Sequence, residues 1–335
     1  MSVVTQSEEC DLLRQPQAAF ILSVLMVLLL SVGVVSNAQG DIYVATNAAP
    51  GGDGSSWVLA YTNIQDALDV AVDNDEIRLA GHTFWVTNQL TWTGRTNITI
   101  KGGWEGAGTP PGSNNPALWP SVVQRVPDGA RKFTNRIFKI SLATGTLSQV
   151  TVKGGWHWDR GTGLHVINST FTLDGCSIVS NTLNGLNLEY MNMYGAGLYA
   201  TNSTIVISNC NFTSNLIWNA QRRSNNQGGG CYLLSGNAMI VNSQFLYNKS
   251  AGGGGAGIPD YSSYGGAVYT GTKCPLTISN CLFIGNEATV DYGPAAGGTI
   301  YAGTNLTMYM SVVSGGVVSN SAEGTAKGGG IYAGA

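Results

Sequence analysis

The chain has 335 residues and a formal net charge of −3, and only 10% of its residues are charged, against about 25% in typical globular proteins. This balance excludes the strongly basic face that nucleic-acid binding requires. It also leaves few charges for solvated helix surfaces, while 46 glycines without a collagen period indicate a turn-rich β-protein.

The first 38 residues have the pattern of an export signal. An apolar stretch over residues 18–35 precedes Ser36-Asn37-Ala38, a small-x-small site that suits cleavage after Ala38. The segment before it holds three acidic residues against a single Arg14, whereas a signal peptide normally begins with positive charge. A misplaced start codon, an uncleaved signal anchor and a buried helix are the alternatives. The sequence predicts a secreted or cell-surface protein, touching a membrane only through a signal anchor or a missing C-terminal domain.

Residues 41–93 predict a separate N-terminal cap. A strand over 41–45 and a glycine-rich loop over 51–57 precede a helix over 62–73, which Thr62 would cap together with Gln65. One face of this helix is apolar: Ile64, Ala67, Leu68, Ala71 and Val72. A strand resumes over 76–80. We expect the helix to cover the open end of the β-structure that follows.

The segment from residue 94 to 335 is built from repeats, and these are regular from residue 161. Residues 94–160 predict less regular repeats around a proline-rich excursion from Pro110 to Pro120. From Gly161 onward, a phrase of small residues followed by an apolar residue recurs at intervals of 31 to 37 residues, a period typical of solenoids. The phrases begin at Gly161, Gly195, Gly228, Gly265, Gly297 and Gly328.

Each phrase is followed by an apolar residue and, three positions later, an asparagine. Alternating β-branched runs such as residues 203–212 predict strands rather than helices. Side chains at equal phase then lie above one another, at about 4.8 Å. The predicted apolar ladder is Phe212, Phe245 and Phe283, continued by Ile178 and Val317. The predicted asparagine ladder is Asn181, Asn215, Asn248, Asn286 and Asn320. The fold class is therefore all-β, a right-handed single-stranded parallel β-helix with an N-terminal amphipathic helix cap.

The Gly-Gly-small-apolar phrase paired with Phe-x-x-Asn resembles the repeats of polymorphic outer-membrane proteins. The entry segments Asp53–Trp57 and Ile64–Leu68 resemble the start of many bacterial right-handed β-helix surface proteins. The resemblance implies a pectin-lyase-like solenoid and an adhesin-type role at the outer membrane or outside the cell. Ile178 departs from the expected phenylalanine, and residues 161–335 have the pattern of repeats rather than of the C-terminal barrel that the resemblance implies. Because the last phrase at Gly328 lacks its second strand and a cap, we expect a C-terminally truncated fragment.

A polysaccharide lyase or glycoside hydrolase is the alternative function, because pectate lyases resemble this architecture. Such enzymes need clustered carboxylates and a base. The repeats offer Asp260, Glu287 and Asp291 near one edge, and we favour their interpretation as solvated loop carboxylates. The chain holds no Asp-Asp pair and its three histidines are scattered. No catalytic residue, metal site or cofactor is predicted.

Three cysteines occupy one phase of the repeat. Cys176, Cys210 and Cys281 precede the apolar ladder position by two residues, and Ser243 takes this place in the third repeat. Two interpretations are open, buried free thiols, which we favour, and a bridge between Cys176 and Cys210.

The connections from each asparagine to the next glycine phrase are expected to form one continuous surface. Aromatic and amide side chains with few charges suit a polysaccharide or a surface protein of a host or neighbouring cell. Shielding of the loop backbone by the tyrosines is the alternative. The candidate ligand-binding residues are Tyr190, Tyr194, Trp218, Arg222, Arg223, Asp260, Tyr261, Tyr264 and Tyr292.

Overall fold

A computed structural model describes residues 40–127, 135–185, 192–219, 224–252, 262–323 and 325–334. The expected export signal lies outside these residues. The described part is all-β, with one helix, α2 (Ile64–Val70), among 35 strands. That helix is too short and not apolar enough to cross a membrane. Residues 39–335 belong to one compact unit.

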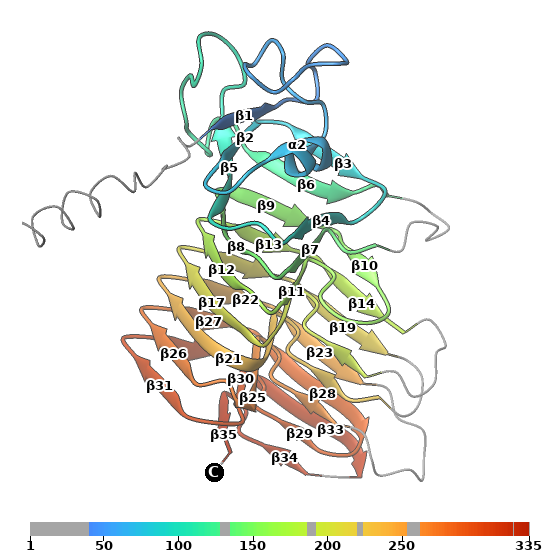
Figure 1. The fold of residues 1–335 in the computed structure, drawn as a ribbon. Coiled ribbons are helices and arrows are strands. Elements are labelled where there is room, and N and C mark those ends of the chain that lie inside the picture. Colours follow the sequence, from blue (N-terminus) through green and yellow to red (C-terminus); the bar gives the residue numbers. More distant parts are fainter. Residues whose placement is uncertain are drawn as a thin grey trace, which may run out of the picture. The chain divides into compact units, whose positions relative to one another are not determined.

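The strands form five stacks, numbered here in the order in which the chain visits them within one coil. Figure 1 shows the strands of successive coils lying side by side in chain order. Stack 1 contains β4 (Leu90–Thr93), β7 (Phe138–Ser141), β11 (Leu164–Ile167), β16 (Leu198–Thr201), the first half of β21 (Cys231–Val241), β25 (Val268–Lys273), β30 (Ile300–Ala302) and β35 (Ile331–Ala333). Stack 2 contains β1 (Asp41–Val44), β2 (Glu76–Ala80), β5 (Ile98–Trp104), β8 (Thr144–Ser148), β12 (Thr170–Asp174), β17 (Ser203–Ser208), the second half of β21, β26 (Leu276–Ser279) and β31 (Leu306–Tyr309). Because β21 takes part in both, stacks 1 and 2 join into one 16-stranded sheet.

The remaining stacks are separate sheets of eight, six and five strands. Stack 3 contains β3 (Thr83–Val86), β6 (Ser121–Arg125), β9 (Val150–Lys153), β13 (Ser177–Val179), β18 (Asn211–Thr213), β22 (Gln244–Leu246), β27 (Leu282–Ile284) and β32 (Val312–Ser314). Stack 4 contains β10 (Trp156–His157), β14 (Thr182–Asn184), β19 (Leu216–Asn219), β23 (Lys249–Gly252), β28 (Glu287–Tyr292) and β33 (Val317–Glu323). Stack 5 contains β15 (Met193–Tyr194), β20 (Asn226–Gln227), β24 (Ser263–Tyr264), β29 (Ala295–Ala296) and β34 (Ala326–Lys327). The paired strands run parallel in every stack, an arrangement compatible with a solenoid.

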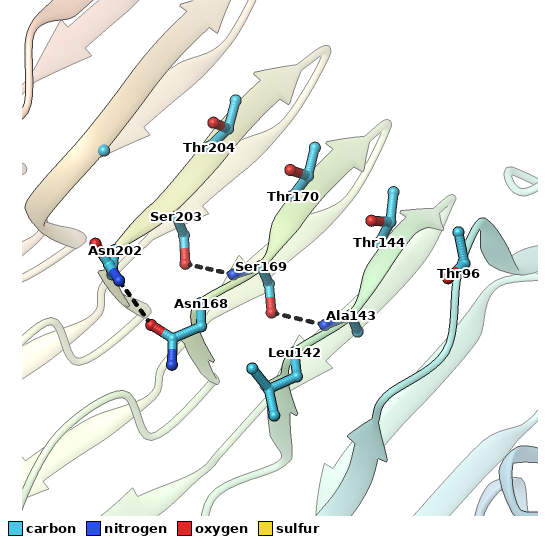
Figure 2. A pocket seen from close by; sticks show the side chains of 11 residues that line it. Thr96, Leu142, Ala143, Thr144, Asn168, Ser169, Thr170, Asn202, Ser203 and Thr204 are labelled. Atoms are coloured by element: carbon cyan, nitrogen blue, oxygen red, sulfur yellow. Dashed lines mark hydrogen bonds between the residues drawn. The ribbon is translucent and has the colours of Figure 1, made fainter.

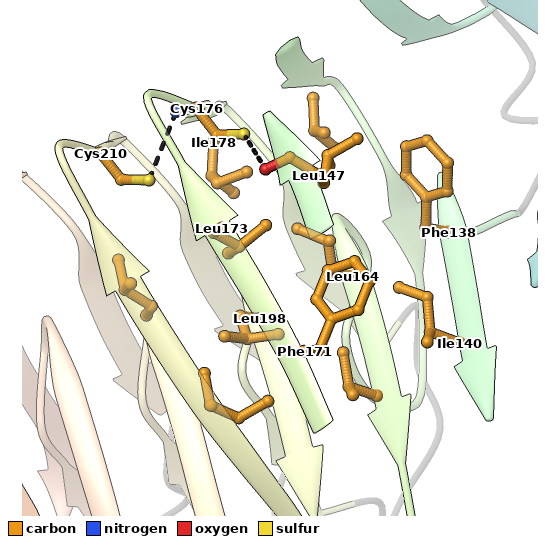
Figure 3. Close-up of a cluster of buried hydrophobic side chains, with 14 of the residues drawn as sticks. Phe138, Ile140, Leu147, Leu164, Phe171, Leu173, Cys176, Ile178, Leu198 and Cys210 are labelled. Carbon is orange, nitrogen blue, oxygen red and sulfur yellow. Dashed lines mark hydrogen bonds between the residues drawn. The ribbon is translucent and has the colours of Figure 1, made fainter. Parts of the chain in front are cut away.

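Apolar side chains from stacks 1, 2 and 3 point into a shared interior. Figure 3 shows Leu164, Phe171 and Ile178, one from each stack, converging there, and all three are buried. The alternation of apolar and polar residues along each strand explains this, because successive side chains point to opposite faces. The core is therefore a continuous column along the coils.

The phenylalanine ladder lies in this column. The ring centroids of Phe212 and Phe245 are 4.7 Å apart, and those of Phe245 and Phe283 are 5.0 Å apart. The strand register places Ile178 below Phe212, as the repeats predict. The predicted continuation at Val317 is wrong, since Phe283 pairs with Val313. Val317 instead begins β33 in stack 4 and is exposed.

The helix differs from its prediction at both ends. Asn63 caps it, and its side chain accepts a hydrogen bond from the Asp66 backbone N–H at 3.0 Å. Tyr61 pairs with Val44 of β1, and the helix begins at Ile64, so Thr62 is not its cap. The helix ends at Val70, and Val72 is therefore exposed rather than part of the apolar face.

The strands of the expected cap segment continue the same stacks as those after residue 94. β2, β3 and β4 pair with β5, β6 and β7 in stacks 2, 3 and 1. The buried helix residues Ile64, Ala67 and Leu68 belong to the same hydrophobic cluster as the core of the later coils.

Candidate functional site

A ladder of asparagines fixes the corner between stacks 3 and 4. The Asn181 side-chain amide donates to Asn215 Oδ1 at 3.0 Å, Asn215 donates to Asn248 Oδ1 at 2.9 Å, and Asn248 donates to Asn286 Oδ1 at 3.0 Å. Each of these oxygens also accepts the backbone N–H of the preceding asparagine. The predicted fifth member, Asn320, is wrong. It pairs with Val290 within β33, and the residue that follows Asn286 in register is Gly316.

The cysteine row is a second ladder, and its thiols are free. The Cys176 backbone N–H donates to Cys210 Sγ at 3.3 Å, and the Cys210 N–H donates to Ser243 Oγ at 3.1 Å. Cys281 donates in the same way to Ser311 Oγ at 3.0 Å. Sulfur and hydroxyl therefore take the same role, which is to satisfy the backbone N–H of the preceding coil. Cys176 and Cys210 form no disulfide.

The ligand surface expected from the sequence comprises the connections that come after stack 4 in the chain. Tyr190, Arg222, Arg223, Asp260 and Tyr261 lie outside the described residues. The described strands around them are in register, with Asn184, Trp218 and Ala251 side by side before the connections. The next strands, in stack 5, are also in register. Successive connections from stack 4 to stack 5 therefore leave and return at the same two edges.

Among the described candidates, Trp218 is 45% exposed at the end of β19, and Tyr292 is half-buried at the end of β28. Tyr194 and Tyr264 belong instead to a set of stacked rings. Tyr194 stacks on Tyr232 at 4.5 Å, and Tyr264 stacks on Tyr301 at 4.7 Å. One face of each of these two rings is therefore covered by another ring of the molecule.

The rings that receive them form a continuous outer column on stack 1. Neighbouring centroids from Tyr199 to Tyr332 are 4.9 to 5.4 Å apart. We call this set the tyrosine column, and its members are His165, Tyr199, Tyr232, Tyr269, Tyr301 and Tyr332. These are the aromatic residues of the repeated phrase. Their stacking was not predicted from the sequence.

A charged cluster lies at the first coil of the tyrosine column. Asp159 bridges two guanidinium groups, with Oδ2 at 2.9 Å from Arg136 Nη2 and Oδ1 at 3.2 Å from Arg160 Nε. The Arg160 guanidinium lies over the Tyr199 ring at 5.5 Å. Burial, followed by the nearby Arg136, lowers the pKa of His165 to about 3. Asp159 offsets one of the two positive charges, and His165 is neutral at physiological pH.

Of the three carboxylates proposed for the alternative enzyme, the structure describes Glu287 and Asp291. Glu287 forms an ion pair with Lys249 at 2.6 Å, which neutralises it. Asp260 lies outside the described residues, and Asp291 is exposed on β28. In the part of the chain that the structure describes, no group of three or more His, Cys, Asp or Glu side chains could hold a metal ion.

A polar trough of about 580 Å³ lies at the corner between stacks 1 and 2. Figure 2 shows Thr144, Thr170 and Thr204 in a row along it, one from each successive strand. Thr170 pairs with Thr144 on one neighbouring strand and with Thr204 on the other, and all three side chains are exposed. The Asn202 side-chain amide donates to Asn168 Oδ1 at 2.9 Å along the same trough. The lining residues are Thr96, Leu142, Ala143, Thr144, Asn168, Ser169, Thr170, Asn202, Ser203, Thr204 and Gly236.

The trough presents neutral hydrogen-bonding groups and carries no charged side chain. Hydroxyl groups recur at the strand spacing of about 4.8 Å. The trough is not among the sites predicted from the sequence. Its signal is the repeated Asn-Ser-Thr at 168–170 and 202–204.

No family model, curated protein or solved structure matches the chain. The interpretation of the trough therefore depends on its own geometry.

Proposed function

We propose that the chain is a single right-handed parallel β-helix that is exported and serves as a non-catalytic binding or structural protein at the cell surface. Parallel stacks visited in the same order in successive coils support one continuous solenoid. The hand is supported by the general rule that parallel crossovers are right-handed in about 98% of cases. The apolar stretch before Ala38 supports export.

The ligand that we propose is an extended neutral glycan bound along the threonine–asparagine trough. The observation that carries this proposal is the recurrence of exposed hydroxyl and amide groups, coil after coil, in a hollow without charge. A polymer whose hydroxyl groups repeat along its length can make the same contact several times. Each hydrogen bond contributes little, but several hydrogen bonds to one glycan chain together give a measurable affinity.

The test is a triple variant, Thr144→Val, Thr170→Val and Thr204→Val, screened on a glycan array against the wild type. Valine keeps the shape and strand preference of threonine while removing the hydroxyl. We expect at least a tenfold loss of affinity for any neutral glycan that the wild type binds. Equal binding by both proteins would contradict the trough as the binding site.

The matched control is the double variant Thr146→Val and Thr172→Val. These residues lie on the same strands and pair with each other, but they do not line the trough. We expect this variant to bind as the wild type does. Incubation of the wild type with polygalacturonate and calcium should release neither unsaturated products nor reducing ends, and robust turnover would favour the lyase or hydrolase alternative.

The connections between stacks 4 and 5 remain a proposed second contact surface, for glycan or protein. Trp218 supports it, because an exposed indole on a rigid strand can stack on a ligand. A Trp218→Ala variant should weaken binding to host-cell or glycan surfaces several-fold. Unchanged binding would remove this surface from the proposal.

A further inference from the structure

A second column of side chains runs beside the tyrosine column, on stack 5. Glycines in the left-handed region separate the two columns, for example Gly195 at φ 62° and Gly297 at φ 58°. The turn at these glycines brings the outer side chains of stacks 5 and 1 together. We call this second set the flanking column: Arg160, Tyr194, Gln227, Tyr264, Ala296 and Lys327.

Planar groups of the flanking column lie on the tyrosine of the next coil. Tyr194 stacks on Tyr232 at 4.5 Å with 24° between the planes, and Tyr264 stacks on Tyr301 at 4.7 Å with 20° between them. The Arg160 guanidinium follows the same rule and lies over Tyr199. In three coils, therefore, a planar side chain of the flanking column covers a ring of the tyrosine column.

Ala296 breaks this rule, because a methyl group cannot reach the tyrosine of the next coil. At this point the surface has a notch of about 80 Å³. One water needs about 10–15 Å³, so the notch has room for a larger group. Its walls are Tyr264, Tyr301 and Tyr332, with Lys327 beside them. Pro294, Ala295, Ala296 and Thr325 complete the lining.

We propose that this notch binds a free aromatic carboxylic acid, with its ring beside Tyr332 and its carboxylate near Lys327. The ring takes the place that Tyr264 takes on Tyr301 one coil earlier, in the offset stacking that aromatic pairs prefer. Lys327 is exposed, and its ammonium group supplies the charge complement for the acid. The site is distinct from the neutral trough and does not depend on the function proposed for it.

The experiment titrates two probes by ligand-observed NMR on the full chain. 4-Hydroxyphenylacetate carries the ring and the carboxylate, and p-cresol carries the ring alone. We expect saturable binding of 4-hydroxyphenylacetate with a Kd on the order of 1 mM, as suits a small ligand with few contacts. Binding of p-cresol should be several-fold weaker.

The first variant, Ala296→Tyr, fills the notch with the ring that the column has elsewhere. We expect at least a tenfold loss of affinity for both probes. Thr307→Tyr is the control, since it adds a phenol on the exposed face of β31 away from the notch, and its affinity should match the wild type. Equal affinity in Ala296→Tyr and the wild type would overturn the proposal.

The second variant separates the charge from the ring. Lys327→Gln should lower the affinity for 4-hydroxyphenylacetate to that for p-cresol. Its affinity for p-cresol should equal that of the wild type. If Ala296→Tyr fails to fold, Tyr332→Leu tests the same site by removing its aromatic wall, with the same tenfold loss expected. A Lys327→Gln variant that binds 4-hydroxyphenylacetate as tightly as the wild type would overturn the assigned role of the carboxylate.

Discussion

Asn215 and Asn248 form the central contact of the asparagine ladder, in which the Asn215 amide donates to Asn248 Oδ1 at 2.9 Å with both side chains fully buried. Asn215 also donates to the Ile178 carbonyl at 2.8 Å and accepts two hydrogen bonds from Asn181. One side chain therefore satisfies polar groups in two coils. The ladder links the corner of each coil to the next.

We expect Asn215→Ala to lower the free energy of unfolding by about 2–5 kcal/mol, because it removes the buried hydrogen bonds to the Asn181 backbone N–H, the Ile178 carbonyl and the Asn181 and Asn248 side chains. Urea unfolding at neutral pH measures the loss. Asn211→Ala is the control: this exposed residue begins β18, and its substitution should cost less than about 0.5 kcal/mol. Equal losses in the two variants would contradict a structural role for the ladder.

The phenylalanine ladder gives a second stability prediction. Phe245 is fully buried between Phe212 and Phe283. Phe245→Ala should lower the free energy of unfolding by about 3–5 kcal/mol, because it removes apolar contacts and leaves a cavity. Phe245→Leu should lower the free energy of unfolding by clearly less, since leucine retains most of the side-chain volume. A loss under about 1 kcal/mol for the alanine variant would show that the coils collapse around the cavity.

His165 predicts a pH dependence. Burial, then the charge of Arg136, lowers its pKa to about 3, whereas an unfolded histidine titrates near 6.5. The unfolded chain therefore binds a proton first, and stability falls as the pH drops below about 6.5. Between pH 7 and pH 4.5 this histidine should account for about 2 kcal/mol of lost stability.

The measurement compares urea unfolding at pH 7 and pH 4.5 for the wild type and His165→Tyr. Tyrosine occupies this position of the column in the later coils and carries no charge in this pH range. We expect the variant to lose less stability on acidification than the wild type. Identical losses would assign the pH dependence to other groups, such as His157, whose pKa burial lowers to about 4.

The cysteines predict a difference in thiol reactivity between the folded and unfolded states. Cys176, Cys210 and Cys231 are buried and free, and burial raises the pKa of the Cys176 and Cys231 thiols. Because the thiolate is the reactive species, these thiols should react slowly with Ellman's reagent until the protein is unfolded. Rapid reaction of the native protein would show that the coils open locally.

Much of the ladder arrangement could be predicted from the sequence. The constant spacing from Phe212 to Phe245 and from Asn215 to Asn248 is enough to place these residues at equal phase. The error at Val317 and Asn320 has a local cause. The last repeat has Val313 and Gly316 at the ladder positions, and a second apolar–asparagine pair four residues later imitates the pattern.

The candidate sites were harder to predict. The trough combines Thr144, Thr170 and Thr204, whose strands follow different connections, and only the strand register brings them into one row. The notch depends on a stacking rule between neighbouring coils, which the spacing within one coil does not contain. The sequence predicts Tyr194 and Tyr264 as ligand-binding residues, but it does not contain the stacking of their rings on Tyr232 and Tyr301.

The sequence by itself determined that the chain alternates strands and corners, and which side chains face inward, because period and polarity are properties of the chain alone. It also determined the residues of the central ladders. The tertiary structure decided which side chains meet between coils: the asparagine amides, the offset tyrosines, the threonine row and the notch at Ala296. The physical reason is that contacts between coils depend on register and on the turn between stacks 5 and 1, which are set only when the strands pair.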